Sequence, residues 1–281
     1  MKLLEALLLG VVQGATEFLP VSSSGHLVLV SWWLGLDAPP LIFSVVVHLG
    51  TTLAVIAYFW QDWWRIIQST LQGVLHRSFD WNHNPEHRIM TMLVIGSIPV
   101  AVVGFALQDY FENTFSNPAM VSISLFITAG LLIYGEYASS ASPDTTHELI
   151  PQQIRFIDSI WIGLAQAFAI MPGISRSGST IAAGLFRGLS RPAAARYSFL
   201  LATPAIIGAG LLETLHIISG EAQFTRDLAG VLFIGFVSAA LVGFASIALL
   251  LQVVKRHRLY GFAAYCVVFG MMSLGAVILR G

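Results

Sequence analysis

The segment Pro20-Val21-Ser22-Ser23-Ser24-Gly25 interrupts an apolar region that covers about residues 1–36. A second apolar region, about 159–190, is interrupted in the same way by Pro172-Gly173-Ile174-Ser175-Arg176-Ser177-Gly178. Such breaks free backbone polar groups, which at membrane depth are tolerated only where protein or a watery cavity satisfies them. Each region therefore predicts a helix that enters a membrane, breaks, and returns as a second short helix.

The composition of the chain places these breaks inside a bilayer. Of 281 residues, 56% are hydrophobic and only 10% are charged, and the mean hydropathy is +0.77. Soluble domains carry about 25% charged residues, and a chain of this length could not hide so much apolar surface from water. The formal net charge of −1 and the absence of a basic cluster in the sequence argue against a nucleic-acid partner.

Six further stretches are long and apolar enough to cross a hydrocarbon core, which takes about 20 residues. With the two broken regions they predict an all-α polytopic membrane protein, a single integral membrane domain over 1–281. The predicted spans are 42–61, 90–108, 118–137, 194–217, 229–250 and 260–279.

The two broken regions resemble one another at a constant offset of 153 residues, as in Gly163 against Gly10. Each half then consists of one re-entrant helix pair and three spans, with repeat 1 over about 1–140 and repeat 2 over about 155–281. An odd number of crossings per half turns the second copy upside down, which is the inverted-repeat architecture. The matched residues are Gly10, Gln13, Ser22, Ser24, Gly25, Gly35, Leu36 and Pro39, against Gly163, Gln166, Ser175, Ser177, Gly178, Gly188, Leu189 and Pro192.

Basic residues in the loops predict the orientation of the chain. The loops 62–89, 138–158, 187–196 and 251–259 fall on one side and hold most of the arginines, whereas the loops 109–117 and 218–228 on the other side hold only Arg226. Both termini, and the opening of the first re-entrant pair, are therefore expected outside the cytoplasm.

The two breaks have the composition of a phosphate site. A break followed by a helix presents free N–H groups and a positive dipole end, and small Ser and Gly side chains let an anion approach them. Arg176 adds a guanidinium suited to a phosphate or pyrophosphate. Close packing of small residues between helices is the simpler alternative, but it does not explain an arginine within the membrane.

Glu17 and His26 flank the first break and suggest chemistry rather than binding alone. A buried carboxylate and an imidazole can act as general base and acid, and a hydroxyl between them, from Ser23 or a neighbour, could be a nucleophile. Alternatively, Glu17 simply pairs with Arg176. His48 and Glu213 are more simply interpreted as satisfied polar groups within spans.

Three stretches resemble the signatures of the bacterial undecaprenyl-diphosphatases, the bacitracin-resistance family. They are Gln13 to Glu17, Phe18 to His26, and Pro172 to Thr180, and the similarity extends through Tyr197 to Pro204 over nearly the full chain. The resemblance implies a membrane phosphatase that converts undecaprenyl pyrophosphate to undecaprenyl phosphate and inorganic phosphate. It recycles the carrier lipid for the synthesis of peptidoglycan and other wall polymers.

The resemblance also implies roles for individual residues. Glu17, Ser23, His26 and Arg176 correspond to the acidic, nucleophilic, proton-transfer and phosphate-binding residues of the family. Position 13 is Glu or Gln in the family, and the neutral Gln13 is a poor candidate for a base. The expected substrate-binding residues are Gln13, Ser22, Ser24, Gly25, Ser175, Ser177, Gly178 and Thr180.

Members of this family depend on a divalent cation, which implies Mg²⁺ or Ca²⁺ here. Because Glu17 is the only acid in the motifs, a cation bridging the substrate phosphates and this one carboxylate is the expected form.

Two classes of function remain from the sequence. The first is hydrolysis of a polyprenyl pyrophosphate by an enzyme of the bacterial inner membrane. The second is a transporter or flippase of a phosphorylated polyprenyl lipid, because inverted repeats with broken helices are also transporter architecture. The expected partners are the lipid substrate and membrane lipids; a homodimer is left open, as is the choice between a covalent phosphoserine and direct attack by water.

Overall fold

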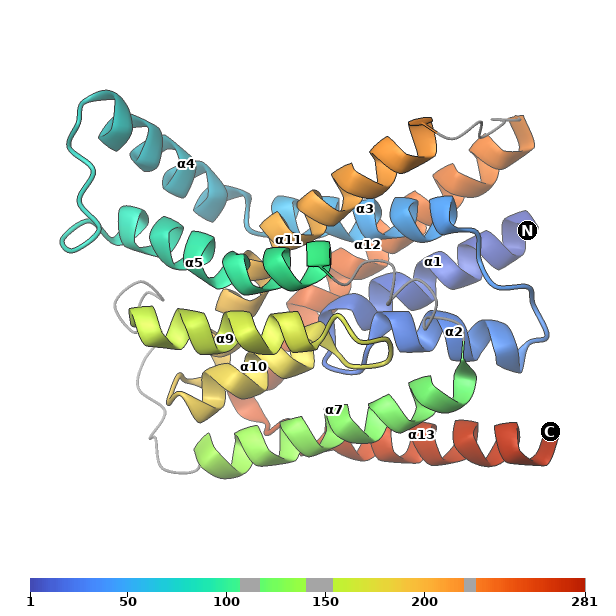
Figure 1. The fold of residues 1–281 in the computed structure, drawn as a ribbon. Coiled ribbons are helices and arrows are strands. Elements are labelled where there is room, and N and C mark those ends of the chain that lie inside the picture. The colour runs from blue at the N-terminus through green and yellow to red at the C-terminus, as the bar shows by residue number, and fades with distance from the viewer. Residues whose placement is uncertain (107–116, 140–153, 220–225, 281) are drawn as a thin grey trace.

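The computed structural model describes residues 1–106, 117–139, 154–219 and 226–280 (Figure 1). Within these ranges every regular element is a helix. The prediction of an all-α fold is therefore confirmed.

Six helices are long and apolar enough to cross a membrane. They confirm the six predicted spans, with ends shifted by a few residues, and make the chain a multi-pass membrane protein. They are α3 (Leu41–Tyr58), α5 (Pro85–Ala106), α7 (Pro118–Ser139), α11 (Arg191–Ser219), α12 (Arg226–Arg256) and α13 (Tyr260–Arg280).

Four shorter helices form the two broken regions. Helix α1 (Leu3–Phe18) is followed after a four-residue break by α2 (Ser23–Trp33), and α9 (Phe156–Phe168) is followed by α10 (Arg176–Phe186). With 11 to 16 residues each, they rise about 16 to 24 Å, less than the roughly 30 Å of a hydrocarbon core. In each region the chain turns back where its sequence has Pro, Gly and Ser.

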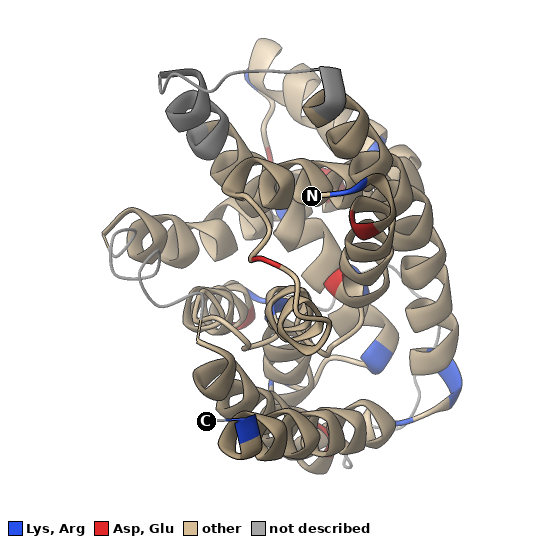
Figure 2. Cartoon of the chain, turned by 90° about the vertical axis from the view of Figure 1, so that its right-hand side faces the viewer, with Lys and Arg blue, Asp and Glu red and all other residues tan. Residues whose placement is uncertain are grey.

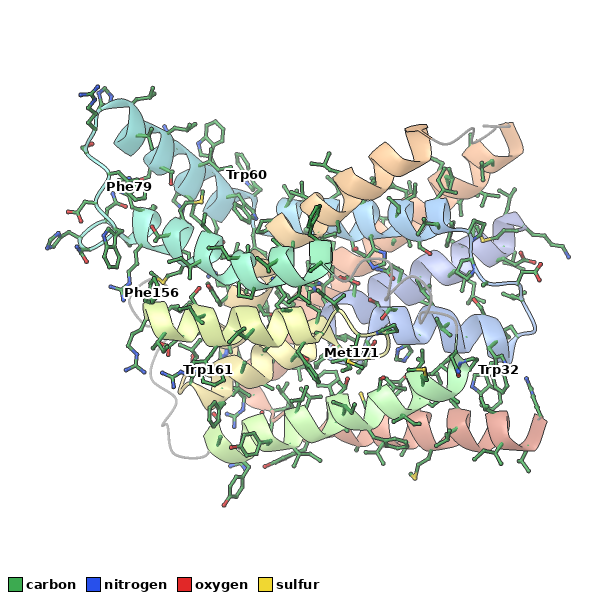
Figure 3. All side chains as sticks on the ribbon, in the orientation of Figure 1. Trp32, Trp60, Phe79, Phe156, Trp161 and Met171 are labelled. Atoms are coloured by element: carbon green, nitrogen blue, oxygen red, sulfur yellow. The ribbon has the colours of Figure 1, made fainter. Side chains whose placement is uncertain are left out.

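The breaks lie deep in the bundle rather than at its ends. Figure 3 places Met171, in the second break, well inside the length of the bundle, whereas Phe156 at the start of α9 lies at one end. Helix α1 begins at the opposite end, where both termini lie (Figure 1). This opposed placement is what an inverted repeat predicts; the repeat boundaries remain a prediction.

Matching glycines hold the first helix of each pair against a span. Gly10 of α1 packs on Gly235 and Ser238 of α12, and Gly163 of α9 packs on the backbone of Gly96 in α5. Gly10 and Gly163 are equivalent under the offset of 153 residues. Small residues let helix backbones approach this closely in a membrane.

Gly163→Ala is expected to destabilise the protein, because its new Cβ would meet the backbone of Gly96, which cannot move aside as a flexible side chain would. Gly130→Ala in α7 is the matched control, since a Cβ there meets nothing within 4 Å. In detergent, we expect Gly163→Ala to lower the apparent melting temperature and Gly130→Ala to leave it unchanged. Equal melting temperatures would refute this packing account.

The segment 62–89, expected to be a loop, begins with a helix, and this expectation was wrong in that part. Helix α4 (Trp60–Leu75) is strongly amphipathic and exposes Trp60, Trp64 and Leu71, and it projects from the bundle at the end opposite the termini (Figure 1). Its three tryptophans, at 60, 63 and 64, are residues typical of the membrane–water interface. With 16 residues, this helix is shorter than a span and is not revealed by span length and hydropathy.

Charged residues are sparse, and several of them form ion pairs. Figure 2, which looks at the end that bears both termini, shows a few Lys, Arg, Asp and Glu positions in an otherwise uncharged bundle. At the other end, the buried Asp158 and Glu136 and the partly buried Asp62 accept from arginines of the predicted basic loops. The pairs are Arg187–Asp158 at 2.9 Å, Arg191–Glu136 at 2.8 Å and Arg196–Asp62 at 2.6 Å.

Candidate active site

The two breaks end in the same helix cap. Ser22 caps α2 and accepts a hydrogen bond from the Gly25 amide at 3.2 Å, and Ser175 caps α10 and accepts from the Gly178 amide at 3.0 Å. A capping serine satisfies one of the free N–H groups of the first turn. The equivalence that the repeat predicts thus extends to individual hydrogen bonds.

Further hydroxyls line each cap. Ser24 lies 3.4 Å from Ser22 and Ser177 lies 3.2 Å from Ser175, in each case between Oγ atoms. Ser177 also donates to the carbonyl oxygen of Leu19 at 3.0 Å. The second helix terminus is therefore fastened directly to the first break.

The backbone of Ser22 has φ = 73°, in the left-handed region that favours glycine. Its equivalent Ser175 has φ = −73°. Non-glycine residues in this region are strained by about 1–3 kcal/mol and occur often at functional sites. The imidazole of His26 holds this turn, since its Nδ1 donates to the carbonyl oxygen of Ser22 at 2.7 Å.

The two breaks meet in an ion pair between Glu17 and Arg176. Arg176 Nη2 donates to Glu17 Oε1 at 2.6 Å, and the carboxylate side chain is 5% exposed. A charged pair inside a membrane protein needs this close geometry to offset its desolvation. The pairing that the sequence offered as an alternative is therefore present, and it joins one residue from each broken region.

The second carboxylate oxygen, Oε2 of Glu17, collects the polar groups of the first break. Ser23 donates to it from Oγ at 2.5 Å, and Gln13 donates from Nε2 at 2.9 Å. A hydroxyl hydrogen-bonded to a carboxylate is the arrangement that a nucleophile and its base require. The structure thus brings four of the predicted site residues, Gln13, Glu17, Ser23 and Arg176, into one cluster.

Arg176 retains a free donor within this cluster. Its Nη1 is buried and has no hydrogen-bond partner among the residues that the structure describes. A buried guanidinium nitrogen without an acceptor is costly, so an acceptor from outside the chain would complete the site. An oxyanion placed between the Ser-capped helix termini would supply it.

Two predicted site residues form their hydrogen bonds outside this cluster of side chains. His26 Nε2 lies 2.7 Å from the Tyr265 hydroxyl of α13, and its ring stacks on Phe269, with no described hydrogen bond to Glu17, Ser23 or Arg176. Thr180 donates to the carbonyl oxygen of Arg176 at 2.8 Å and lies 2.6 Å from the Ser198 hydroxyl. In this structure both residues hold their helix in place.

Sequence reasoning undervalued one residue and missed two others. His48 of α3, interpreted as a satisfied polar group, has its Nε2 3.7 Å from Glu17 Oε2. Thr128 supports the second break by accepting from the Ser175 amide at 3.0 Å, and Tyr265 contacts His26. No motif marks these distant helices, so only the packing of the spans reveals them.

Gln166, which the repeat comparison matches to Gln13, is also buried. Neither polar atom of its amide has a described hydrogen-bond partner. The position equivalent to Glu17 is Ile170, so the second break has no acid for this amide. The sequence repeat identifies the pair Gln13 and Gln166. The absence of an acid at Ile170, the position equivalent to Glu17, shows in the sequence that the two copies differ.

The described residues provide few ligands for a metal ion. They contain no group of three or more His, Cys, Asp or Glu side chains arranged to hold one. Glu17 is the acid of the cluster, and both of its oxygens already accept hydrogen bonds. The unpartnered Oε1 of Gln13 is a further oxygen of the kind that Mg²⁺ and Ca²⁺ bind. The site thus fits a cation held mainly by a ligand's oxygens, not a cage of protein groups.

Comparison with known proteins identifies relatives of this chain. The undecaprenyl-diphosphatase of Desulforudis audaxviator is 42% identical over 99% of this chain and 98% of its own length. That of Methanosphaera stadtmanae is 39% identical over 97% of each chain, and that of Korarchaeum cryptofilum is 40% identical over 98% and 99%. The family described as bacitracin resistance protein BacA matches residues 6–272. The chain therefore belongs to the BacA bacitracin resistance protein family.

Proposed function

We propose that this protein is a membrane phosphatase that hydrolyses undecaprenyl pyrophosphate to undecaprenyl phosphate and inorganic phosphate. Its relatives are named undecaprenyl-diphosphatases and match it over nearly their whole length. The observation that carries the proposal is the cluster in which Ser23 and Arg176 bind the same Glu17 carboxylate. This cluster combines a nucleophile, a base and a phosphate-binding cation.

In this proposal the pyrophosphate lies between the two helix termini. The N–H groups and hydroxyls at Ser22–Gly25 and Ser175–Gly178 bind its oxygens, together with Arg176 Nη1. Charge that develops on the phosphoryl oxygens in the transition state is stabilised by these fixed donors. Binding of the phosphate also gives the buried Nη1 the acceptor that it lacks in the described residues.

Ser23 attacks the terminal phosphorus, or orients the water that does so, while Glu17 accepts its proton. The bond from that phosphorus to the bridging oxygen breaks, and its electron pair stays on undecaprenyl phosphate. Where Ser23 itself attacks, a water then hydrolyses the phosphoserine, which releases inorganic phosphate and restores the Ser23 hydroxyl. His26 shapes the nucleophile's turn through its hydrogen bond to Ser22. A proton-transfer role for His26 would run through Tyr265, its other hydrogen-bond partner.

We place the prenyl chain in a mostly apolar cavity of about 780 Å³ beside the first break. The cavity lies between α1, α12 and α13 and is lined by Leu19, Val21, Val253 and Phe262, among others. Ligand sites of this size are mostly apolar, with few polar groups. Its contact with Leu19 and Val21 would bring a chain lying there to within reach of the Ser-rich turn.

The proposal includes a divalent cation, Mg²⁺ or Ca²⁺, that binds together with the substrate. Glu17, with Gln13 Oε1 beside it, would be its protein contact, and it would supply charge neutralisation for the pyrophosphate. The proton transfers described above are carried out by this chain's own residues.

We further propose a bacterial inner-membrane location, with the termini and the site opening on the extracytoplasmic side. The concentration of arginines at the end opposite the termini supports this orientation, and the matching caps and glycine contacts support an inverted repeat. The enzyme would serve cell-wall synthesis by recycling the carrier lipid and so confer bacitracin resistance. Membrane lipids are expected neighbours. No observation favours the alternative of a lipid transporter or flippase.

The direct test is phosphate release from undecaprenyl pyrophosphate by the purified protein in detergent. We expect release that stops with a chelator and returns when Mg²⁺ or Ca²⁺ is added in excess, because a cation held mainly by substrate oxygens exchanges readily. Phosphate release that the chelator does not change would contradict the proposed need for a divalent cation. No release under either condition, with lipid movement in vesicles, would contradict the phosphatase and favour the transporter.

A further inference from the structure

The connection between α12 and α13 carries a run of basic side chains, which we call the basic turn. Its residues are Lys255, Arg256, His257 and Arg258. All of them are exposed, and none forms an ion pair with an acid among the residues that the structure describes. Arg187, Arg191 and Arg196, at the same end of the bundle, are paired with acids. The basic turn therefore carries positive charge that the described chain does not neutralise.

The backbone of the basic turn is held from inside the protein. The amide of Leu259, which is buried, donates to Glu136 Oε1 of α7 at 2.8 Å. The same carboxylate is bound by Arg191 at 2.8 Å, so its charge is already compensated. The turn is thus fixed in place while its basic side chains point outward, which lowers the entropy that a ligand must overcome on binding.

The cavity of about 780 Å³ beside the first break extends to this turn. His257 and Arg258 line it, together with Val253 before them and Gly261 and Phe262 after them. Helix α12 packs on α1 and α3, whereas α13 packs on α7. The two helices therefore diverge from the turn that joins them and leave a mostly apolar space with basic groups at one end.

The basic turn lies at the depth of the lipid headgroups. It connects the membrane spans that end at Arg256 and begin at Tyr260. Tyr260 is 39% exposed, and tyrosine is typical of the membrane–water interface. The guanidinium carbon of Arg258 lies 6.0 Å from the centre of the Tyr260 ring. Basic pockets between membrane helices at this depth bind the phosphate groups of lipids.

We propose that the basic turn and the cavity bind an anionic phospholipid of the surrounding bilayer. Its phosphate contacts His257 and Arg258, and one acyl chain enters the cavity toward Leu19. A guanidinium forms two parallel hydrogen bonds with a phosphate, and an imidazole N–H adds a donor. Apolar side chains replace the bilayer around the acyl chain. The charge of the turn thus finds the partner that it lacks in the described chain.

This site goes beyond the phosphatase function, because no step of the reaction requires the lipid. One consequence does rest on the proposed function. We place the prenyl chain of the substrate in the same cavity, so an acyl chain bound there competes with it. The phospholipid is therefore expected to act as a competitor of the substrate.

The test is the affinity of the purified protein for dioleoylphosphatidylglycerol, measured by displacement of a fluorescent phosphatidylglycerol, with dioleoylphosphatidylcholine for comparison. The wild type should prefer phosphatidylglycerol. Arg258→Gln should weaken this affinity by about 10-fold or more, the loss expected for hydrogen bonds to a charged group. Lys255→Gln is the matched control, because it removes the same charge nearby but Lys255 does not line the cavity. It should lose at most about 5-fold, the contribution of one surface charge.

A second pair of variants tests the place of the acyl chain. Gly261→Leu adds a side chain where a Cβ meets nothing within 4 Å, so it fills part of the cavity without displacing its neighbours. It should weaken the binding of phosphatidylglycerol by about 10-fold, the loss of roughly two buried CH₂ groups. Gly275→Leu, on the same helix, is equally open and lies outside the cavity, and it should match the wild type. Glycerol 3-phosphate, a headgroup without chains, should not displace the lipid.

Equal affinities for the two phospholipids, or equal losses in Arg258→Gln and Lys255→Gln, would overturn the proposed site. Displacement by glycerol 3-phosphate, or full binding by Gly261→Leu, would overturn the place of the acyl chain. In the activity assay, phosphatidylglycerol in place of phosphatidylcholine at constant total lipid should raise KM for undecaprenyl pyrophosphate and leave kcat unchanged. An unchanged KM would contradict the shared cavity. Failure of the phosphatase function is a separate outcome: no phosphate would be released with either lipid, and the binding measurements would still decide the site.

Discussion

Arg176→Ala is expected to reduce phosphate release from undecaprenyl pyrophosphate by about 10³-fold or more, the lower range for an arginine that stabilises a transferring phosphoryl group. The variant removes the buried Nη1 that faces no acceptor. It also removes the partner of Glu17 Oε1, which leaves a carboxylate buried without compensation. Both effects weaken binding and the transition state, so kcat and KM should change together.

Arg176→Lys is a conservative companion, because it keeps the charge but not the two-pronged geometry of the guanidinium. It should retain part of the activity. Arg65→Ala serves as the matched control, since the Arg65 side chain is 57% exposed and its hydrogen bonds in the described part of the chain lie within α4. The measurement is steady-state phosphate release by the wild type and each variant, on folded, monodisperse protein. Near-normal turnover by Arg176→Ala would refute the arginine's role.

Ser23→Ala should have the second large effect, a loss of about 10³-fold or more in kcat if Ser23 is the nucleophile. The hydroxyl is the group bonded to Glu17 Oε2 at 2.5 Å, and alanine leaves no atom to attack. Substrate binding should be nearly retained, because the helix caps and Arg176 remain. The separate measurements are kcat by phosphate release and affinity for the lipid pyrophosphate.

Ser31→Ala is the matched control on the same helix, since its buried hydroxyl has no described hydrogen-bond partner. It should leave the rate unchanged. Acid quenching with substrate labelled in its terminal phosphate distinguishes the two routes. Label on Ser23 indicates a phosphoserine, whereas no label together with loss of rate in Ser23→Ala indicates an oriented water. Full activity in Ser23→Ala would contradict both routes.

The fold was largely predictable because a membrane constrains the sequence strongly. Membrane spans can be recognised by their length and hydropathy. A polar cluster such as Pro172–Gly178 is tolerated at membrane depth only where the helix breaks. Helix α4 could not be predicted in this way, because its 16 residues are fewer than a span needs and its polar face lowers the hydropathy. Its boundaries follow from packing and interface residues, not from hydropathy.

The site could be predicted where its residues are consecutive in the sequence and form a recognisable motif. Ser22–Gly25 and Ser175–Gly178 show their role through the repeat, and the meeting of Glu17 with Arg176 follows from two breaks sharing the membrane interior. The positions of His26 and His48 could not be read from the sequence. His26 follows the serines directly yet faces Tyr265, whereas His48, 31 residues beyond Glu17, reaches the carboxylate. Helix rotation and packing decide such contacts.

The central claim is that one phosphate site is built from both breaks, and a double-variant comparison tests it most directly. The measurement is kcat/KM for undecaprenyl pyrophosphate in Ser23→Ala, Arg176→Ala and the combined variant. Residues that act on the same phosphate as a unit show strongly non-additive effects, so the combined variant should be little worse than the poorer single one. Losses that multiply independently, or a fully active single variant, would contradict a shared site.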